Sequence, residues 1–282
     1  MLFRSLPSVN SLAALRVGQS ERLNKQNFIA FADPYFSKDQ ANAATKNQIT
    51  QLSTRGISLN LRSVPKTSKV SSAELGLLPR LPDTSLEVIE IGKILESKPE
   101  DIFLHENASV KKVLSTDFSK KNIVMFATHG LVPGELNGLT QPALALSAPD
   151  VTGESEGDGL LTMDKILELK LNADWVVLSA CNTASSANSS EALSGLGRAF
   201  FYAGAKALLV SNWPVETISS RELMVDLFKR QIGQNKITKP EALRQAMLNI
   251  ADKGSAKDEK TKAISYYYAH PLFWAPFVMV GD

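Results

Sequence analysis

The chain has 282 residues, of which 44% are hydrophobic and 21% charged, and this globular composition excludes collagen-like, coiled-coil and disordered proteins. Lys and Arg number 31 against 29 Asp and Glu, and the resulting net charge of +2 argues against direct nucleic-acid binding. The single cysteine, Cys181, can form neither an internal disulfide nor a cysteine-based metal site, which fits a cytoplasmic protein.

The sequence carries no recognisable membrane or secretion signal. The longest apolar stretches, near residues 174–181 and 272–280, fall far short of the roughly 18 residues that a membrane span needs. The first 17 residues have no sustained apolar core, which argues against a signal peptide. We therefore expect a cytoplasmic protein that does not contact a membrane.

Five apolar runs are predicted to form strands. Most of them are continuous rather than alternating, which is typical of strands buried on both faces of a parallel sheet. In chain order the predicted strands are Phe28–Ala32, Ile123–Ala127, Trp175–Ala180, Ala207–Ser211 and Phe277–Val280.

Helical patterns alternate with these runs. In chain order they begin near Thr84, follow Thr162, span about Ser190–Ala203, follow Ser219 and Ser220 as far as Gly233, and begin after Thr238. The last has the clearest start, because Thr238 and Glu241 form a capping box with Pro240 in the first turn. This alternation predicts an α/β fold with helices on both faces of a mostly parallel sheet.

Two segments do not follow this alternation. Residues 37–80 are rich in Ser, Thr, Asn and Lys and are expected to form an insertion or a long surface excursion. Residues 147–159 hold three Gly and four acidic residues, so we expect a mobile acidic loop. With no internal repeat present, we predict one domain over residues 28–282, preceded by a lead-in over residues 1–27.

The phosphate-binding and hydrolase motifs of α/β folds are absent from the sequence. Gly195 and Gly197 begin a dinucleotide-like pattern, but Phe200 stands where that fingerprint needs Gly or Ala. Neither a P-loop nor a GxSxG nucleophile elbow occurs. A Rossmann enzyme and an α/β-hydrolase are both disfavoured.

Cys181 and His129 each follow the end of a predicted strand. Ligands and catalytic groups gather at the carboxyl edge of open α/β sheets, although a lone cysteine is also often a buried structural thiol. If the two strands are neighbours, His129 faces Cys181 and can accept the thiol proton or stabilise the thiolate. The amides of Gly130 and Cys181 are then candidate donors to an oxyanion.

The other two histidines have weaker settings. His105 lies in a predicted short strand end or turn, and we assign it no role. His270 precedes Pro271, which favours an extended backbone, and we interpret it as an orienting or packing residue.

The runs Phe126–Gly130 (FATHG) and Leu178–Thr183 (LSACNT) resemble the CHAT domain, a group of caspase-like cysteine peptidases related to separase. Four further blocks resemble the family in the family's order: Asp158–Leu161, Gly195–Ala205, Asn212–Glu216 and His270–Gly281. The resemblance implies a caspase–hemoglobinase fold, a His129–Cys181 dyad, and peptide-bond hydrolysis that uses no metal and no cofactor.

The resemblance also implies a substrate pocket. It places Trp213, Asp158 and Glu216 at this pocket, with Glu216 matching an acidic residue that reads a basic P1 side chain in separase. For Glu216 the alternative is an exposed carboxylate that stabilises the start of a helix through its dipole.

We therefore expect a regulated cysteine endopeptidase with a protein substrate, and the family suggests prokaryotic defence or cell death as its setting. The tetratricopeptide or other sensing modules that usually precede the domain do not occur in the sequence. We expect a regulatory protein or such a module to control activity. The alternative is a catalytically silent CHAT-like module that acts in docking or assembly.

Overall fold

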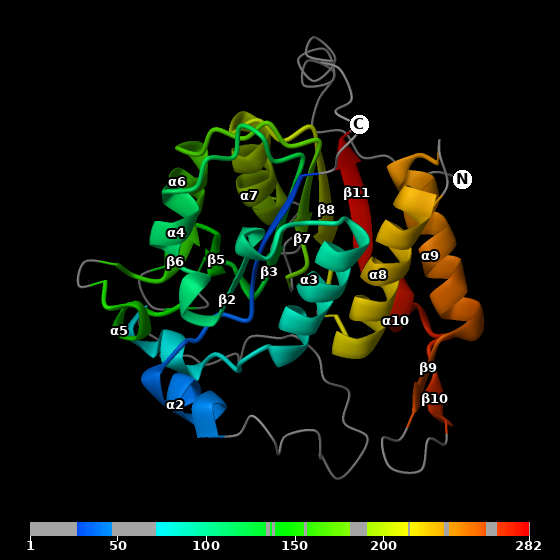
Figure 1. Cartoon of the computed structure of the whole chain (residues 1–282), viewed down its shortest axis with the longest axis horizontal. Helices are drawn as coiled ribbons and strands as arrows, with labels where there is room; N and C mark the ends of the chain where they lie inside the picture. Colours follow the sequence, from blue (N-terminus) through cyan, green and yellow to red (C-terminus); the bar gives the residue numbers. More distant parts are fainter. Residues whose placement is uncertain are drawn as a thin grey trace.

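The computed structural model describes residues 27–46, 72–133, 136, 139–154, 157–180, 191–213, 215–233, 237–257 and 264–281. The predicted nucleophile, Cys181, and nearly all of the predicted lead-in lie outside these residues. The described residues form a central sheet covered by helices on both faces (Figure 1), which confirms the predicted α/β class.

The central sheet has six strands in the order β11-β8-β7-β3-β1-β2. Their bounds are β1 (Phe28–Ala32), β2 (Ile102–Leu104), β3 (Ile123–Ala127), β7 (Trp175–Leu178), β8 (Ala207–Ser211) and β11 (Phe277–Gly281). Every neighbouring pair is parallel except β11 and β8, which are antiparallel. All five predicted strands are present in this sheet, although β7 ends at Leu178 instead of Ala180, and the three-residue strand β2 was not predicted.

The helices cover the sheet in two groups (Figure 1). One face carries α3 (Pro82–Ile94), α8 (Thr217–Gly233), α9 (Lys239–Lys253) and α10 (Pro271–Trp274). The other face carries α4 (Val110–Leu114), α6 (Met163–Leu167) and α7 (Glu191–Tyr202). The Thr238 hydroxyl accepts a 3.4 Å hydrogen bond from the Glu241 amide, as the capping box predicts. None of the described helices is long and apolar enough to cross a membrane.

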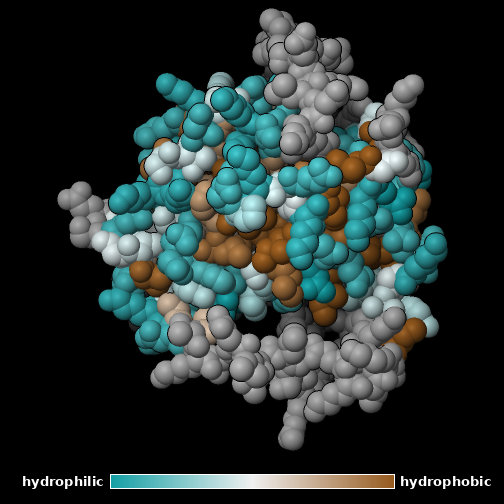
Figure 2. Space-filling view, in the orientation of Figure 1, coloured by the Kyte–Doolittle hydropathy of each residue, from teal (hydrophilic) through white to brown (hydrophobic). Residues whose placement is uncertain are grey.

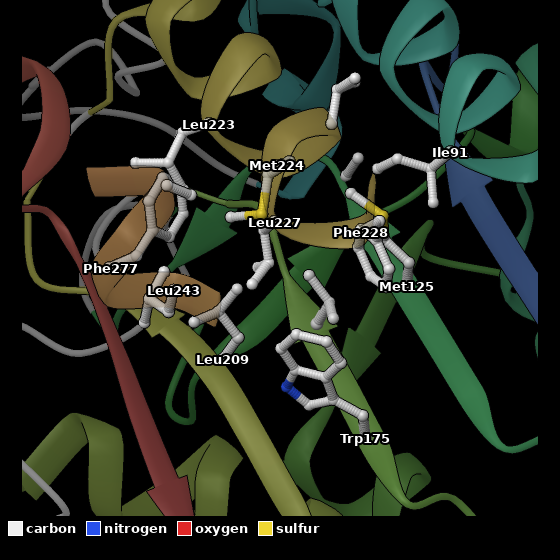
Figure 3. Close-up of a cluster of buried hydrophobic side chains, with 14 of the residues drawn as sticks. Ile91, Met125, Trp175, Leu209, Leu223, Met224, Leu227, Phe228, Leu243 and Phe277 are labelled. Carbon is white, nitrogen blue, oxygen red and sulfur yellow. The ribbon is translucent and has the colours of Figure 1, made fainter. Parts of the chain in front are cut away.

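Alternate residues of each central strand face two different cores. Phe28 and Ala30 pack in the core beneath α3 and α8, whereas Ile29 and Phe31 pack in the core on the other face. Figure 3 shows the first core, where the Trp175 ring meets Phe228 of α8, with their centres 5.2 Å apart. Burial on both faces explains why these strands read as continuous apolar runs.

The edge strand β2 is only partly covered. Its three residues are half-buried, and the Lys112 ammonium lies 4.7 Å from the Phe103 ring centre. Figure 2 shows apolar residues near the middle of this face, over the region of β2 and α3, with hydrophilic residues around them. So short an edge, flanked by a lysine, offers little backbone for pairing with another strand.

A small antiparallel sheet, absent from the sequence prediction, packs beside the main one. It consists of β4 (Gly130–Leu131), β5 (Ala143–Ala145) and β6 (Leu160–Thr162) in the order β4-β5-β6. A separate hairpin pairs β9 (Ser255–Lys257) with β10 (Ile264–Tyr267). The remaining described elements are α2 (Lys38–Lys46), η1 (Ser72–Leu77), η2 (Pro99–Asp101), η3 (His105–Asn107) and α5 (Pro149–Thr152).

The two irregular segments contain more structure than their composition indicates. Within residues 37–80, Leu75 and Leu78 are buried in a core shared with the small sheet, so the end of this segment is not a surface excursion. The prediction used the average composition of the whole segment, which is polar, whereas burial depends on the individual apolar side chains of these two leucines. Within residues 147–159, Ser147 and Ala148 are buried, and α5 begins at Pro149.

Candidate active site

The parallel strands end at one edge of the sheet, and this edge carries the candidate site. β3 pairs directly with β7, with Phe126 opposite Leu178. The strand before His129 and the strand before Cys181 are therefore neighbours, which is the condition that the sequence analysis set for a dyad.

The backbone of His129 is fixed where the chain passes from the main sheet to the small sheet. The His129 carbonyl accepts a 2.9 Å hydrogen bond from the Ala145 amide, and the Thr128 hydroxyl donates to the Ala145 carbonyl. The next residue, Gly130, begins β4 and pairs with Leu144. Bonds on both sides of His129 therefore hold it at the sheet edge.

The imidazole of His129 is fully buried and has a defined orientation. Its Nε2 lies 2.8 Å from the Pro79 carbonyl oxygen, and its ring centre lies 5.4 Å from that of Phe36. A carbonyl oxygen can only accept, so Nε2 carries the proton in this contact. A neutral imidazole in this tautomer has its lone pair on Nδ1, which is then the nitrogen that can accept a proton.

An ion pair anchors the peptide that holds His129. Arg80, directly after Pro79, donates from Nε and Nη2 to the two carboxylate oxygens of Asp33 at 2.9 and 2.7 Å. Asp33 is fully buried just beyond β1, and its amide donates to the Thr84 hydroxyl at 2.9 Å. The bidentate geometry compensates the buried carboxylate and fixes Arg80 in one position.

His105 and Tyr35 complete this cluster. His105 Nε2 lies 3.1 Å from an Asp33 oxygen, and its ring stacks on Tyr35 with centres 4.7 Å apart. Burial raises the pKa of the Tyr35 phenol and outweighs the opposite effect of Arg80, so the ring is neutral at physiological pH. Asp33 and His105 have φ angles of 47° and 57°, a left-handed backbone that costs about 1–3 kcal/mol per residue.

This cluster has no predicted role, yet one signal for it was present in the sequence. Asp33 immediately follows a buried strand, which is the same position that singled out His129 and Cys181. The pairing of Asp33 with Arg80 had no such signal, because 47 positions separate them along the chain.

On the other side of His129, the residues after β7 are also held by buried polar groups. The Ser179 hydroxyl donates a 2.8 Å hydrogen bond to Glu87 of α3, and its amide donates to the Phe126 carbonyl at 2.9 Å. The Ser211 hydroxyl, at the end of β8, donates to the Ala180 carbonyl. Glu87 is fully buried, and no feature of the sequence had marked it.

Glu216 is positioned as the N-cap of α8. Its two carboxylate oxygens accept hydrogen bonds from the Ile218 and Ser219 amides at 3.1 and 2.7 Å. The side chain is 2% exposed, so the capping carboxylate is buried and not exposed as the alternative interpretation expected. A carboxylate at this position satisfies two free amides and stabilises the helix dipole.

The other predicted pocket residues contact different elements. Trp213 donates from its indole to the Leu272 carbonyl of α10 at 3.4 Å. Asp158 accepts from the Leu160 amide at 2.9 Å and from Lys165 Nζ at 2.7 Å. Trp213 is therefore tied to α10 near the end of the described chain, and Asp158 to β6 and α6 in its middle; none of these contacts involves Glu216.

His270 has the extended backbone that Pro271 favours, but it is not the packing residue that the sequence suggested. It is exposed and caps α10, because its Nδ1 accepts a 3.2 Å hydrogen bond from the Leu272 amide. It therefore serves as a control for His129 in the experiments below.

The chain is similar to a known protein family and to two known proteins. A family model described as the CHAT domain matches residues 2–282. Tetratricopeptide repeat protein 28 of Mus musculus is 30% identical over 125 residues, which is 44% of this chain and 4% of the relative. The Homo sapiens protein of the same name gives the same identity and coverage. The match thus spans only a small part of these relatives' own length.

The Asp33–Arg80 pair leads to a stability prediction. Arg80→Ala is expected to lower the free energy of unfolding by about 3 kcal/mol, because it leaves a buried carboxylate without its main partner. Urea unfolding measures the change. Lys229→Ala is the control, since Lys229 and Glu90 form a largely exposed pair worth about 1 kcal/mol or less. Equal losses in the two variants would show that the Asp33–Arg80 pair contributes no more than a surface pair.

Proposed function

This chain belongs to the CHAT domain family, which is related to caspase-like cysteine peptidases, and on that premise we propose that it is a cysteine endopeptidase. The observation that carries the proposal is the setting of His129 beside the strand that leads to Cys181. His129 donates from Nε2 to the Pro79 carbonyl, so Nδ1 bears the lone pair of the neutral ring. His129 and Cys181 each stand three positions after a residue of the pair Phe126–Leu178, and this equal spacing supports a dyad.

In the proposed reaction, His129 acts as general base and then as general acid. Nδ1 accepts the Cys181 thiol proton, and the thiolate attacks the carbonyl carbon of the scissile peptide bond. The amides of Gly130 and Cys181 donate to the oxyanion of the tetrahedral intermediate. His129 then protonates the leaving amine, and an acyl-thioester remains on Cys181. Water hydrolyses this thioester after losing a proton to His129, which restores the free thiol. The proposed reaction uses no metal and no cofactor.

The dyad is tested by substitution. Cys181→Ala and His129→Ala are each expected to abolish peptide cleavage. His129→Ala is also expected to cost about 1–3 kcal/mol of stability, because it leaves the Pro79 carbonyl without its donor. His270→Ala is the matched control, since an exposed capping histidine has no part in the reaction and its loss should leave kcat unchanged.

The same experiment separates a peptidase from a silent docking module. Since Cys181 is the chain's single cysteine, iodoacetamide labelling reports on it alone. A dyad thiol should be alkylated well below pH 8.5, the ordinary thiol pKa, because a neighbouring imidazolium stabilises the thiolate. Peptide cleavage that survives in Cys181→Ala would rule out the dyad, and an unreactive thiol without cleavage would favour the docking module.

We extend the proposal to a basic P1 residue read by Glu216, with Trp213 and Asp158 as further pocket residues. A carboxylate offers about four acceptor sites, so the two capping bonds of Glu216 leave capacity for a substrate donor. The family resemblance supports this role, whereas the deep burial of Glu216 favours capping alone.

The P1 proposal predicts a preference for Arg or Lys over Met. A charge-assisted hydrogen bond of about 1.5–3 kcal/mol corresponds to about ten- to hundredfold in kcat/KM. Glu216→Gln should reduce this ratio, since the amide oxygen retains acceptor capacity but not charge. Peptides that differ only at P1 measure the ratio. A ratio unchanged in Glu216→Gln would restrict Glu216 to capping, and a preference for P1 Asp would exclude a basic P1 altogether.

We also propose that a regulatory partner, such as a tetratricopeptide module, controls this site in the cytoplasm, in a prokaryotic defence or cell-death setting. Two similar proteins are named for tetratricopeptide repeats, which is compatible with such a module. The segment of residues 147–159 is a candidate control element. Its first residue, Ser147, accepts from the Tyr35 amide and donates to the His105 carbonyl, so the segment begins at the Asp33 cluster.

Control of this kind predicts weak cleavage by the isolated chain. Apart from Ala148 and Val151, which pack in the core of the small sheet, residues 147–159 offer few apolar side chains to bury, so we expect their ordered and open states to differ by only a few kcal/mol. Partner binding should raise kcat and slow hydrogen exchange of the amides in residues 147–159. Strong cleavage by the isolated chain, with those amides already protected, would contradict control by a partner and would indicate that activity is limited by the availability of the substrate.

A further inference from the structure

The geometry points to Glu87 and Ser211 as positioning residues that hold the dipeptide Ser179–Ala180, which directly precedes the proposed nucleophile, Cys181. We call these contacts the clamp. The inference rests on the proposed function, because it gives the clamp the task of aligning the nucleophile with its base.

The first side of the clamp comes from α3. Trp175 and Val177 face the core beneath this helix, and Ser179 continues the same face of the strand two residues further on. Glu87 is fully buried on α3 and accepts the Ser179 hydroxyl at 2.8 Å. A helix on one face of the sheet therefore holds a side chain two positions before the nucleophile.

The other sides of the clamp come from the two neighbouring strands. The Ser179 amide donates to the Phe126 carbonyl at 2.9 Å and so extends the pairing with β3 beyond the end of β7. The Ser211 hydroxyl, on the β8 side, donates to the Ala180 carbonyl. The dipeptide is thus held by a helix and by strands on both sides, and its last carbonyl belongs to the peptide bond that includes the Cys181 nitrogen.

Packing alone does not explain why the carboxylate of Glu87 is buried at this position. The neighbouring buried positions of α3, Val88 and Ile91, are filled by aliphatic side chains. An apolar residue at position 87 would avoid the desolvation of a carboxyl group, which is costly unless hydrogen bonds compensate it. A role in fixing the chain before the nucleophile would explain the buried Glu87 carboxylate, because a displacement of about 1 Å at a reacting atom can lower a rate by about 10²-fold.

The clamp is tested with Glu87→Ala, Ser179→Ala and the double variant. The first readout is the pH profile of Cys181 alkylation by iodoacetamide, and the second is kcat and KM for peptide cleavage. Each single variant should shift the alkylation profile towards pH 8.5 and lower kcat about ten- to hundredfold with little change in KM. The double variant should lose no more than the worse single variant, because both substitutions break the same bond.

Two further variants separate positioning from general stability. Glu87→Gln should keep most of the wild-type kcat, because its amide oxygen can accept the same hydrogen bond. Ser109→Ala removes another buried serine, the N-cap of α4, and should lower stability while leaving the alkylation profile unchanged. If Glu87→Ala fails to fold, Ser179→Ala removes one hydroxyl and carries the test alone.

The possible outcomes are distinct. Wild-type alkylation profiles in both Glu87→Ala and Ser179→Ala would overturn the clamp, as would a loss in Glu87→Gln equal to that in Glu87→Ala. If the wild-type chain cleaves no peptide, the proposed function fails while the alkylation profiles still decide whether the clamp sets the state of Cys181.

Discussion

The parallel pairing of β3 with β7 is the constraint on which the rest of this structure depends. Parallel neighbours end at the same edge of a sheet, so this one pairing brings the chain at His129 beside the chain that leads to Cys181. Both strands are buried on both faces by helices, which leaves their register little freedom. A slip of one residue would move every side chain of a strand to the opposite core.

The same edge collects charged and polar groups that are buried, and each has a partner. Asp33 is bound by a guanidinium and a histidine, and Glu87 by a serine hydroxyl. Buried groups of this kind destabilise a fold unless hydrogen bonds compensate them. Their concentration at one edge, together with the left-handed backbone of Asp33 and His105, is typical of a functional site.

The small antiparallel sheet has a different role, because it fixes the path of the backbone directly after His129. β4 pairs with β5 immediately beyond this residue, and the Ala145 amide bonds to the His129 carbonyl. On the opposite side, the Pro79 carbonyl accepts from the imidazole, and Pro79 belongs to a segment that Leu75 of η1 and the following Leu78 anchor in the core shared with the small sheet. The base is therefore oriented by two parts of the chain that lie on either side of it in sequence.

The sequence by itself determined the elements that local chemistry controls. β1, β3 and β8 have the predicted bounds, because a continuous apolar run is a local signal of a strand buried on both faces. The position of His129 just beyond the carboxyl end of β3 could be inferred in the same way, and so could the capped start of α9. What the sequence did not reveal are strands of two or three residues, such as β4 and β5, which are too short to show a period.

Only the tertiary structure decided which polar groups meet. Ser179 and Glu87 are 92 positions apart, and His129 and Pro79 are 50 apart, so no local pattern links either pair. The tertiary structure also made Glu216 a buried helix cap, which composition and spacing could not distinguish from an exposed carboxylate. The physical reason is that a hydrogen bond depends on distances of about 3 Å. Strand order and helix packing set these distances, and they arise only when the whole apolar core assembles.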